Sequence, residues 1–366
     1  MTVLHLDAGR TWRGGQQQVY LLHRELTRRG VDSRLLARGE LLERCRGEGL
    51  AAARLPGRGG WTPGGLAAVL GASRGAAILH AHDSHALGLA AVVRTVRPGL
   101  RLIGHRRVSY PLSGGAFSRW KYQSADAWVA VSAEIARVLA RGGVPAGSIS
   151  VVHSAVDLAA LRAAASRADL GFLRAELDLP EGAPVVGFCG AFSPQKGHRL
   201  LAEAARSVRD RIPDALFLLP GEGDLLPEVR ARTEALGLAA AFRFPGFRRD
   251  VAAVTALFTI AAVPSVDGEG SSAALKEPMA LGVPVVASDL EGNVEVLGRA
   301  GAVFPRGDAA ALARVLARLL GNAEERARLA QGGRERVRAF DPAGMAEGIL
   351  AAYRTAARRA EGGERP

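Results

Sequence analysis

The chain of 366 residues is 48% hydrophobic, 5% aromatic and 23% charged, with a formal net charge of +12. Its length exceeds a typical single core, and its composition indicates a globular rather than a disordered chain, so two globular domains are expected. Apolar runs are broken well before about 18 residues, which predicts no transmembrane helix, and two cysteines, Cys45 and Cys189, indicate a reducing cytoplasm rather than a disulfide framework.

Short apolar segments alternate with helical patterns along the whole chain. The amino end has no basic leader and is expected to begin directly with a strand. In the first half the predicted strands are 2–7, 33–38, 77–82, 101–105, 127–132 and 150–152. In the second half they are 185–190, 215–220, 242–245, 258–264, 284–288 and 302–304. A βαβ series of this kind predicts an α/β fold with a doubly wound parallel sheet in each half.

Composition along the chain predicts where the domains meet. We expect a first domain over residues 1–165, a second over 166–340 and a carboxyl-terminal segment over 341–366. The boundary falls in 155–184, where Ala/Arg-rich helix gives way to a turn-rich stretch. Asp341 and Pro342 are typical of a helix start, and apolar residues then recur at helical spacing up to Arg359. This helix is expected to return to the first domain, and the tail 361–366 is expected to fray.

The positive charge is concentrated in the first half of the chain. Residues 1–160 contain 21 Lys and Arg against 10 Asp and Glu, whereas residues 161–366 contain 27 against 26. Such a field attracts an anionic partner, for example a membrane surface, an acidic lipid or a phosphorylated acceptor. The alternative is compositional bias, since 45 of the 48 basic residues are Arg. A nucleic-acid partner is not expected, because no aromatic-interleaved basic sheet or helix-turn-helix is recognisable.

The most informative segment joins the predicted strand 258–264 to a helix. Glu269 follows that strand, and open α/β sheets bind ligands beyond the carboxyl ends of their strands. Gly270, Ser271 and Ser272 open the next helix, whose free amides favour an anion. Glu277 follows eight positions after Glu269. A phosphate cradle beside two hydroxyl acceptors predicts a sugar-nucleotide site; the alternatives are two solvated glutamates or the paired carboxylates of a glycoside hydrolase.

These residues resemble family 4 of the glycosyltransferases with the GT-B fold, in which two Rossmann-like domains face each other across a cleft. The resemblance extends from the first strand to about residue 355. It is carried by the Gly14-Gly15 turn, by Ile78-Leu79-His80-Ala81-His82, by Ala125 through Ser132, by Gly190 through Lys196-Gly197, and by Glu269-x7-Glu277 with Gly282 through Ala287. The sequence departs from the family pattern at three places. Ala191 replaces an arginine, His153 through Asp157 replaces the "N-G-[VI]-D" motif, and Pro278 follows Glu277 inside the expected helix.

The resemblance implies roles for residues of the second domain. Lys196 stabilises the departing diphosphate, although it also fits a solvated loop lysine. Glu277 accepts the ribose hydroxyls, and Glu269 contacts the donor sugar near the reacting carbon. Phe247 and Arg248 lie where the family holds the base, and either side chain is suited to stacking, but a plain loop is also compatible.

The first domain supplies fewer expected contacts. By the same resemblance, Gly14 and Gly15 let the backbone approach the diphosphate without a Cβ clash, and Gln17 opens the following helix. His105 ends the strand 101–105, and it is expected to contact the donor sugar and to orient the acceptor. Histidines at strand ends are also often structural.

Two further pairs of residues in the first domain, His80 with His82 and Arg106 with Arg107, fit either a functional or a structural role. His80 and His82 are expected to include one crevice residue, with His80 the better candidate for packing. Arg106 and Arg107 either receive an anionic acceptor or are solvated.

The resemblance implies a retaining transferase that acts by front-face attack, and it is expected to be metal-independent. A hexosyl unit would pass from a UDP-, GDP- or ADP-sugar to a glycan, glycolipid or lipopolysaccharide-type acceptor, by front-face attack and without a cofactor beyond the donor. No Asp-x-Asp metal motif is present in the sequence. The expected location is the cytoplasm or the inner face of the cytoplasmic membrane. The alternatives are a GT-B epimerase or phosphorylase, and a non-catalytic protein that binds a nucleotide sugar.

Overall fold

The computed structural model describes residues 1–57, 61–112 and 114–361. These residues form two compact units. The first comprises Met1–Ala155 together with the helix that begins at Pro342, and the second comprises Val156–Asp341. The first break comes earlier than the predicted boundary at residue 165, because helix α7 (Leu158–Ser166) packs within the second unit.

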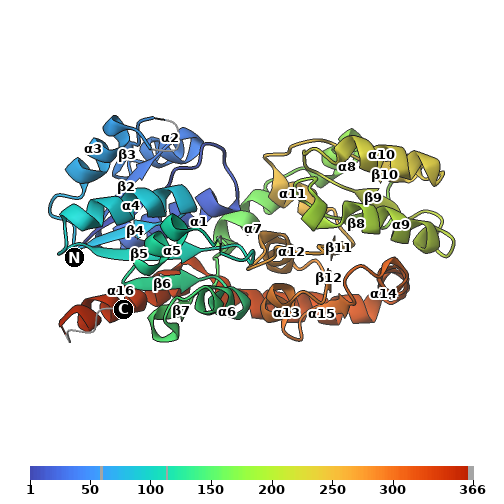
Figure 1. Cartoon of the computed structure of the whole chain (residues 1–366). Coiled ribbons are helices and arrows are strands. Elements are labelled where there is room, and N and C mark those ends of the chain that lie inside the picture. The colour runs from blue at the N-terminus through green and yellow to red at the C-terminus, as the bar shows by residue number, and fades with distance from the viewer. Residues whose placement is uncertain (58–60, 113, 362–366) are drawn as a thin grey trace. The chain divides into compact units, whose positions relative to one another are not determined.

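The amino-terminal unit is built on a seven-stranded parallel sheet of order β3-β2-β1-β4-β5-β6-β7 (Figure 1). Its strands are β1 (Thr2–Leu6), β2 (Asp32–Ala37), β3 (Ala52–Arg54), β4 (Ile78–Ala81), β5 (Arg101–Arg106), β6 (Ala127–Ala130) and β7 (Ile149–Val151). All six predicted strands are present. The sequence missed β3, a largely exposed edge strand of three residues that carries no apolar alternation.

Helices cover both faces of this sheet, because successive strand residues point to opposite sides. The helices are α1 (Gly14–Arg28), α2 (Gly39–Gly47), α3 (Pro63–Ala72), α4 (Ser84–Val96), α5 (Ala116–Gln123) and α6 (Ala133–Arg141), with a 3-10 turn, η1 (Ala146–Ser148). Leu4 and Leu79 face the core that includes α4. Val3 and Ile78 face the opposite core, which α1 and the last helix share.

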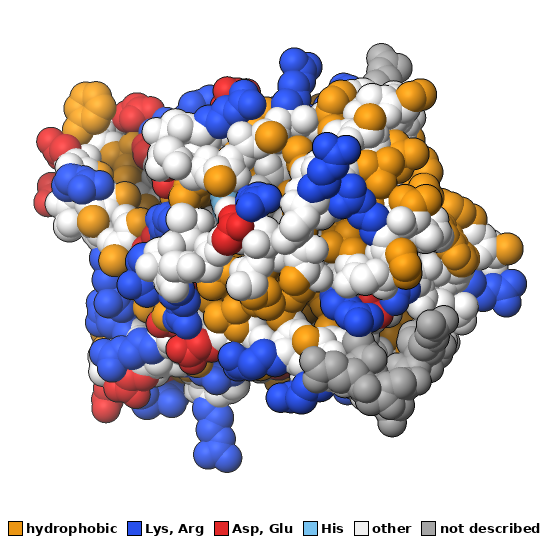
Figure 2. Space-filling view, turned by 90° about the vertical axis from the view of Figure 1, so that its left-hand side faces the viewer, with side chains coloured by type: hydrophobic (Ala, Val, Ile, Leu, Met, Phe, Trp, Pro, Cys, Tyr) orange, Lys and Arg blue, Asp and Glu red, His pale blue; other side chains and the backbone are white. Residues whose placement is uncertain are grey.

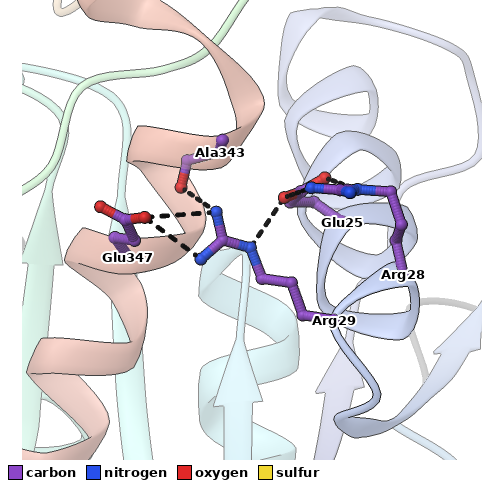
Figure 3. Close-up of polar contacts among 5 residues, drawn as sticks. All are labelled: Glu25, Arg28, Arg29, Ala343 and Glu347. Carbon is purple, nitrogen blue, oxygen red and sulfur yellow. Dashed lines mark hydrogen bonds and ion pairs between the residues drawn. The ribbon is translucent and has the colours of Figure 1, made fainter.

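The last helix, α16 (Pro342–Glu361), completes the amino-terminal unit. Ile349 and Tyr353 are buried in the core beside α1. Figure 3 shows Arg29 at the end of α1 between Glu25 and α16, where it donates to the Ala343 carbonyl at 3.0 Å. In the described ranges no helix is both long and apolar enough to cross a membrane. Of the tail 361–366 that was expected to fray, Glu361 is the last residue of α16, and residues 362–366 lie outside the described part.

The carboxyl-terminal unit contains a six-stranded parallel sheet of order β10-β9-β8-β11-β12-β13, again with helices on both faces (Figure 1). Its strands, all six of them predicted, are β8 (Val185–Gly187), β9 (Leu216–Leu218), β10 (Phe242–Arg243), β11 (Ile260–Val263), β12 (Val285–Ser288) and β13 (Ala302–Phe304). Its helices after α7 are α8 (Leu170–Glu176), α9 (His198–Arg209), α10 (Leu226–Ala235), α11 (Val251–Ala256), α12 (Ala273–Leu281), α13 (Glu291–Leu297), α14 (Ala309–Gly321) and α15 (Ala323–Arg336).

Each sheet has one point at which the strand order reverses. In the first unit β1 lies beside β4, and in the second β8 lies beside β11. Loops that leave the carboxyl ends of such a strand pair diverge to opposite faces and leave a crevice between them. The fold therefore indicates two candidate ligand-binding crevices, one beyond β1 and β4 and one beyond β8 and β11.

Candidate active site

Beyond β8 and β11 the structure brings together the two predicted catalytic residues of the second unit. Lys196 ends the 3-10 turn η2 (Pro194–Lys196) that follows β8, and Glu269 lies in the turn between β11 and α12. The Lys196 Nζ lies 2.7 Å from the Glu269 Oε1. The glutamate is 5% exposed and the lysine side chain 28%. The two residues form one ion pair rather than two independent contacts.

Two glycines let the neighbouring loops approach this pair. Gly197 has φ +70°, and a Cβ there would lie 2.0 Å from the Pro264 carbonyl oxygen. A Cβ on Gly292, at the start of α13, would lie 2.3 Å from the Glu269 carbonyl oxygen. Any other residue at these positions would push the loop after β8, or helix α13, away from the Glu269 turn.

A buried network of hydrogen bonds from Ser265, Ser288 and Asn293 fixes the Glu269 carboxylate. The Ser265 Oγ donates to Glu269 Oε1 at 2.6 Å, and the Ser288 Oγ donates to the Ser265 carbonyl at 2.5 Å. Asn293 in turn donates to the Ser288 Oγ at 3.1 Å. Burial acts to raise the pKa of Glu269, but the charge of Lys196 and these hydrogen bonds outweigh it, so the pKa lies below its usual range. Glu269 is therefore ionised at neutral pH.

Glu277 lies apart from this network, on α12. The helix continues through Pro278 to Leu281, so the proline does not end it. Glu277 lines a small hollow with Cys189 and Thr255, beside the end of β8. Burial raises its pKa to about 7, and only the charge of Lys276 opposes that rise.

Lys276 is a residue that the sequence reasoning missed. It is 1% exposed, its Nζ donates to the Ser271 carbonyl at 3.0 Å, and it lies 4.9 Å above the Phe340 ring. Burial lowers its pKa to about 7 against the attraction of Glu277 and Glu269. Its hydrogen bond to Ser271 stabilises the turn before α12, in which Ser272 is the N-cap residue. One signal was available, because it is one of three lysines in the chain.

Of the two residues predicted to bind the base, Phe247 is exposed and Arg248 is held by ion pairs. Phe247 is 60% exposed and leaves its ring faces accessible. Arg248 is held by two carboxylates, 2.6 Å from Glu176 on α8 and 2.6 Å from Asp250. These hydrogen bonds raise the pKa of Arg248 and fix the position of its guanidinium. A base that stacks on Arg248 would therefore have to fit the guanidinium where these two carboxylates hold it.

In the amino-terminal unit, Asp7 is the buried group beyond β1. Its Oδ1 accepts from the Gly9 amide at 2.9 Å and from the Gln16 side chain at 3.1 Å. Burial and the nearby Asp83 raise its pKa. Gln16 is the glutamine that reaches this carboxylate, and the substrate-binding role expected for Gln17 stays a prediction.

The predicted glycine pair opens α1 nearby. A Cβ added to Gly14 or Gly15 would meet nothing within 4 Å, so the helix start is open to a ligand. The role expected for these glycines stays a prediction.

A group of buried histidines lies on β1 and at the end of β4, where His5 is part of β1, His80 is part of β4 and His82 follows β4. His5, His80 and His82 place one ring nitrogen each within 4.8 Å of one another, a spacing that a metal ion could use. Arg107 opposes that use, because its guanidinium donates to the Nδ1 of His82 at 3.0 Å and brings a positive charge to the group. His80 is 2.6 Å from the Tyr353 hydroxyl of α16, as its predicted packing role implies.

One of the two alternatives for the arginine pair after β5, that both side chains are solvated, was wrong. Arg106 is buried, where it donates to the Tyr122 hydroxyl at 2.8 Å and to the Tyr110 carbonyl, and Arg107 is turned inward to His82. Neither is a solvated surface arginine. Arg106 stabilises the segment before α5, and only Arg107 approaches the histidines.

Two family models cover most of the chain. Residues 12–160 match the model described as Glycosyltransferase Family 4, and residues 183–322 match Glycosyl transferases group 1. The chain belongs to the family 4 glycosyltransferases. The first match contains His105 and the glycine turn, and the second contains the Lys196–Glu269 pair and Glu277.

Relatives with assigned activities agree with this membership. The phosphatidyl-myo-inositol mannosyltransferase of Mycobacterium leprae is 37% identical over 183 residues, 49% of this chain and 48% of that protein. The 2-deoxystreptamine glucosyltransferase of Streptomyces kanamyceticus is 32% identical over 220 residues, 58% of this chain and 56% of that protein. The chain thus matches about half the length of these relatives.

The fold agrees as well. An Anabaena protein, HepE, crystallised with UDP, superposes with a TM-score of 0.82 over 97% of this chain and 100% of its own, at 21% identity. The predicted fold class, GT-B with two Rossmann-like parallel-sheet domains, is confirmed for this family 4 member.

Proposed function

We propose that this chain is a retaining glycosyltransferase that moves a hexosyl unit from a nucleotide sugar to a glycan or lipid acceptor, without a metal ion. One observation carries the proposal: Lys196 and Glu269 are paired at 2.7 Å where the strand order of the second sheet reverses. Ligands of open α/β sheets bind at such a point. The pair offers a cation for a diphosphate and a carboxylate for hydroxyl groups in one crevice.

The donor half of the reaction needs charge stabilisation. As the bond between the anomeric carbon and the phosphate oxygen breaks, negative charge develops on the nucleoside diphosphate. Lys196, 28% exposed, has donors beyond the one directed at Glu269 and extends them to this charge. Glu269 holds the ammonium in place and, being ionised, accepts from sugar hydroxyls. The amides before α12 add a helix amino terminus on the same side.

The acceptor half follows from the proposed front-face attack. The acceptor oxygen bonds to the anomeric carbon on the face that the diphosphate leaves, and its proton passes to the departing phosphate oxygen. The anomeric configuration is retained, and no separate base is required. Closure around the donor would exclude water and so favour transfer over hydrolysis.

The decisive experiment measures release of nucleoside diphosphate from UDP-, GDP- and ADP-sugars with and without acceptors. Because the relatives named above act on phosphatidyl-myo-inositol and 2-deoxystreptamine, these two compounds form the first acceptor panel. We expect acceptor-dependent release with one donor, and a product that keeps the donor's anomeric configuration by NMR. Binding without turnover under every acceptor would favour the non-catalytic alternative, and conversion of the donor sugar without release would favour an epimerase.

A membrane-associated acceptor is compatible with the surface of the amino-terminal unit. Figure 2 shows Lys and Arg side chains spread among apolar ones over one face. Trp61, Phe117 and Trp120 are exposed and adjacent, with ring centroids 5.7 and 5.4 Å apart along the series. Arg119 is exposed on the same helix, α5. Aromatic rings beside basic residues are typical of surfaces that bind anionic membrane interfaces.

We therefore expect the chain to sediment with vesicles of equal parts phosphatidylglycerol and phosphatidylcholine, and less so at high salt. Replacing Phe117 and Trp120 by Ser should lower the bound fraction severalfold, because apolar insertion is lost. Phe172→Ser is the matched control, since Phe172 is 69% exposed on α8 of the other unit. Equal binding by the double variant and the control would remove this surface from the proposal.

A further inference from the structure

Four of the eight histidines gather around a single arginine in the amino-terminal unit. The Nη2 of Arg107 lies 3.0 Å from the Nδ1 of His82 and 3.2 Å from the Nδ1 of His105, and its Nη1 donates to the His82 carbonyl at 2.8 Å. His5 and His80 complete the group, and the rings of His80 and His105 are stacked with centroids 5.3 Å apart.

The arginine determines where the proton of His105 sits. A guanidinium can only donate hydrogen bonds, so the Nδ1 of His105 must present its lone pair to Arg107. A neutral imidazole carries one proton, which is therefore on Nε2. Within the described residues this Nε2 has no hydrogen-bond partner, and the side chain is only 8% exposed. A buried N–H donor without a partner is costly, so a ligand oxygen placed within hydrogen-bond distance of this Nε2 would be stabilised by it.

Arg107 is itself held in its charged form. Burial lowers its pKa to about 10, while Asp7 and Asp83 act in the opposite direction. Asp83 caps α4 and accepts from the Ala8 amide at 2.6 Å, so this hydrogen bond joins the loops after β1 and β4. At neutral pH the guanidinium remains a donor, and the tautomer of His105 remains set.

From this geometry we infer that Arg107 is a positioning residue that locks His105 as a neutral Nε2–H donor. The inference rests on the proposed function, and it deepens it. His105 would donate a hydrogen bond to an oxygen of the donor sugar or the acceptor, and it would not accept the acceptor's proton through Nε2. This division agrees with a mechanism in which the leaving phosphate takes that proton.

The surroundings of His105 keep the imidazole neutral. Burial, followed by the charges of Arg107, His80 and His5, holds its pKa well below the usual range. From α16 the Tyr353 hydroxyl faces His80, and burial raises the pKa of that tyrosine, so this hydroxyl is uncharged at neutral pH. Asp7 and Asp83 face Arg107 rather than counting among the groups that shift His105.

The direct test is NMR of the full chain labelled with ¹⁵N at histidine. Long-range ¹H–¹⁵N spectra distinguish the two tautomers, and the His105 signals are assigned by their loss in His105→Gln. We expect a protonated Nε2 and an unprotonated Nδ1 from pH 6 to 8. In Arg107→Met the signals should shift toward the other tautomer or toward the charged form, whereas Arg107→Lys should shift them less. Arg74→Met, at an exposed arginine of the same unit, is the control that should change nothing.

Kinetics supply a second readout once a donor and acceptor are known. The amide of Gln can replace an Nε2–H donor but cannot replace a base. We expect His105→Gln to retain kcat within about tenfold and His105→Ala to lose about 100-fold. An Nδ1-protonated His105 in the unmodified chain, an unchanged tautomer in Arg107→Met, or equal losses in the two His105 variants would each overturn the inference. The NMR result does not depend on turnover, so it separates this inference from the proposed activity.

Discussion

Replacing Lys196 with Met is expected to lower kcat/KM for sugar transfer by about 100- to 1000-fold, the size of effect seen when one preorganised donor is removed from a developing oxyanion. The loss should appear mainly in kcat, because the charge on the diphosphate grows as the glycosidic bond breaks. Steady-state kinetics with the donor found in the release assay measure it. Full activity in this variant would remove Lys196 from the mechanism.

Folding stability separates this catalytic role from a structural one. In Lys196→Met the Glu269 carboxylate stays buried without its partner, which should cost about 1–3 kcal/mol of unfolding free energy. Adding Glu269→Gln removes the unpaired charge, so the double variant should recover most of that stability but none of the activity. Asp267→Asn is the matched control, because Asp267 is an exposed carboxylate in the same turn. Recovery of activity together with stability in the double variant would mean that the pair only supports the fold.

Glu277 is expected to control nucleotide affinity, with a distinct pH dependence. Its pKa is raised to about 7 by burial, so the carboxylate that would accept two ribose hydroxyls is largely ionised at pH 8 and largely protonated at pH 6. Nucleoside diphosphate should therefore bind about tenfold more tightly at pH 8 than at pH 6. Glu277→Ala should lose most of the thermal stabilisation by the ligand, and Glu277→Gln should bind weakly with little dependence on pH. Thermal-shift titrations at the two pH values measure both effects.

The control for this prediction is Glu234→Gln on α10, an exposed glutamate of the same unit. It should keep the full shift and the full pH dependence. Unchanged stabilisation by the nucleotide in Glu277→Ala would show that the ribose assignment is wrong. An unchanged pH dependence in Glu277→Gln would assign the titration to another group.

Much of the fold could be read from local pattern. Twelve of the thirteen strands that the described residues form were predicted, because buried parallel strands are short apolar runs bounded by turns. The missed strand β3 has only three residues and two of them are exposed, so no hydrophobic signal marks it. The first domain boundary was expected at residue 165 within the range 155–184, and the units separate at the start of that range, after Ala155. The composition of α7 resembles the preceding chain, and only its packing assigns it to the second unit.

The candidate site was less accessible to such reasoning. Glu269 and Lys196 were each identified from their turns, but they are 73 positions apart, and nothing local reveals that they form an ion pair. Arg248 was expected beside a base, and no local signal reveals that Glu176, 72 positions away, also binds its guanidinium. Lys276 looked like an ordinary helix residue, because its burial depends on which face of α12 packs inward.

The amino-acid sequence by itself determined the two parallel-sheet domains, the positions of the turns after β8 and β11, and the residue types that suit a diphosphate and a sugar. These depend on interactions between near neighbours, such as apolar periodicity, helix capping and glycine conformation. Only the tertiary structure decided which charges are paired, which carboxylate is ionised and which nitrogen of His105 carries its proton. Those properties depend on burial and on partners supplied by distant strands, because desolvation and hydrogen bonding act through space rather than along the chain.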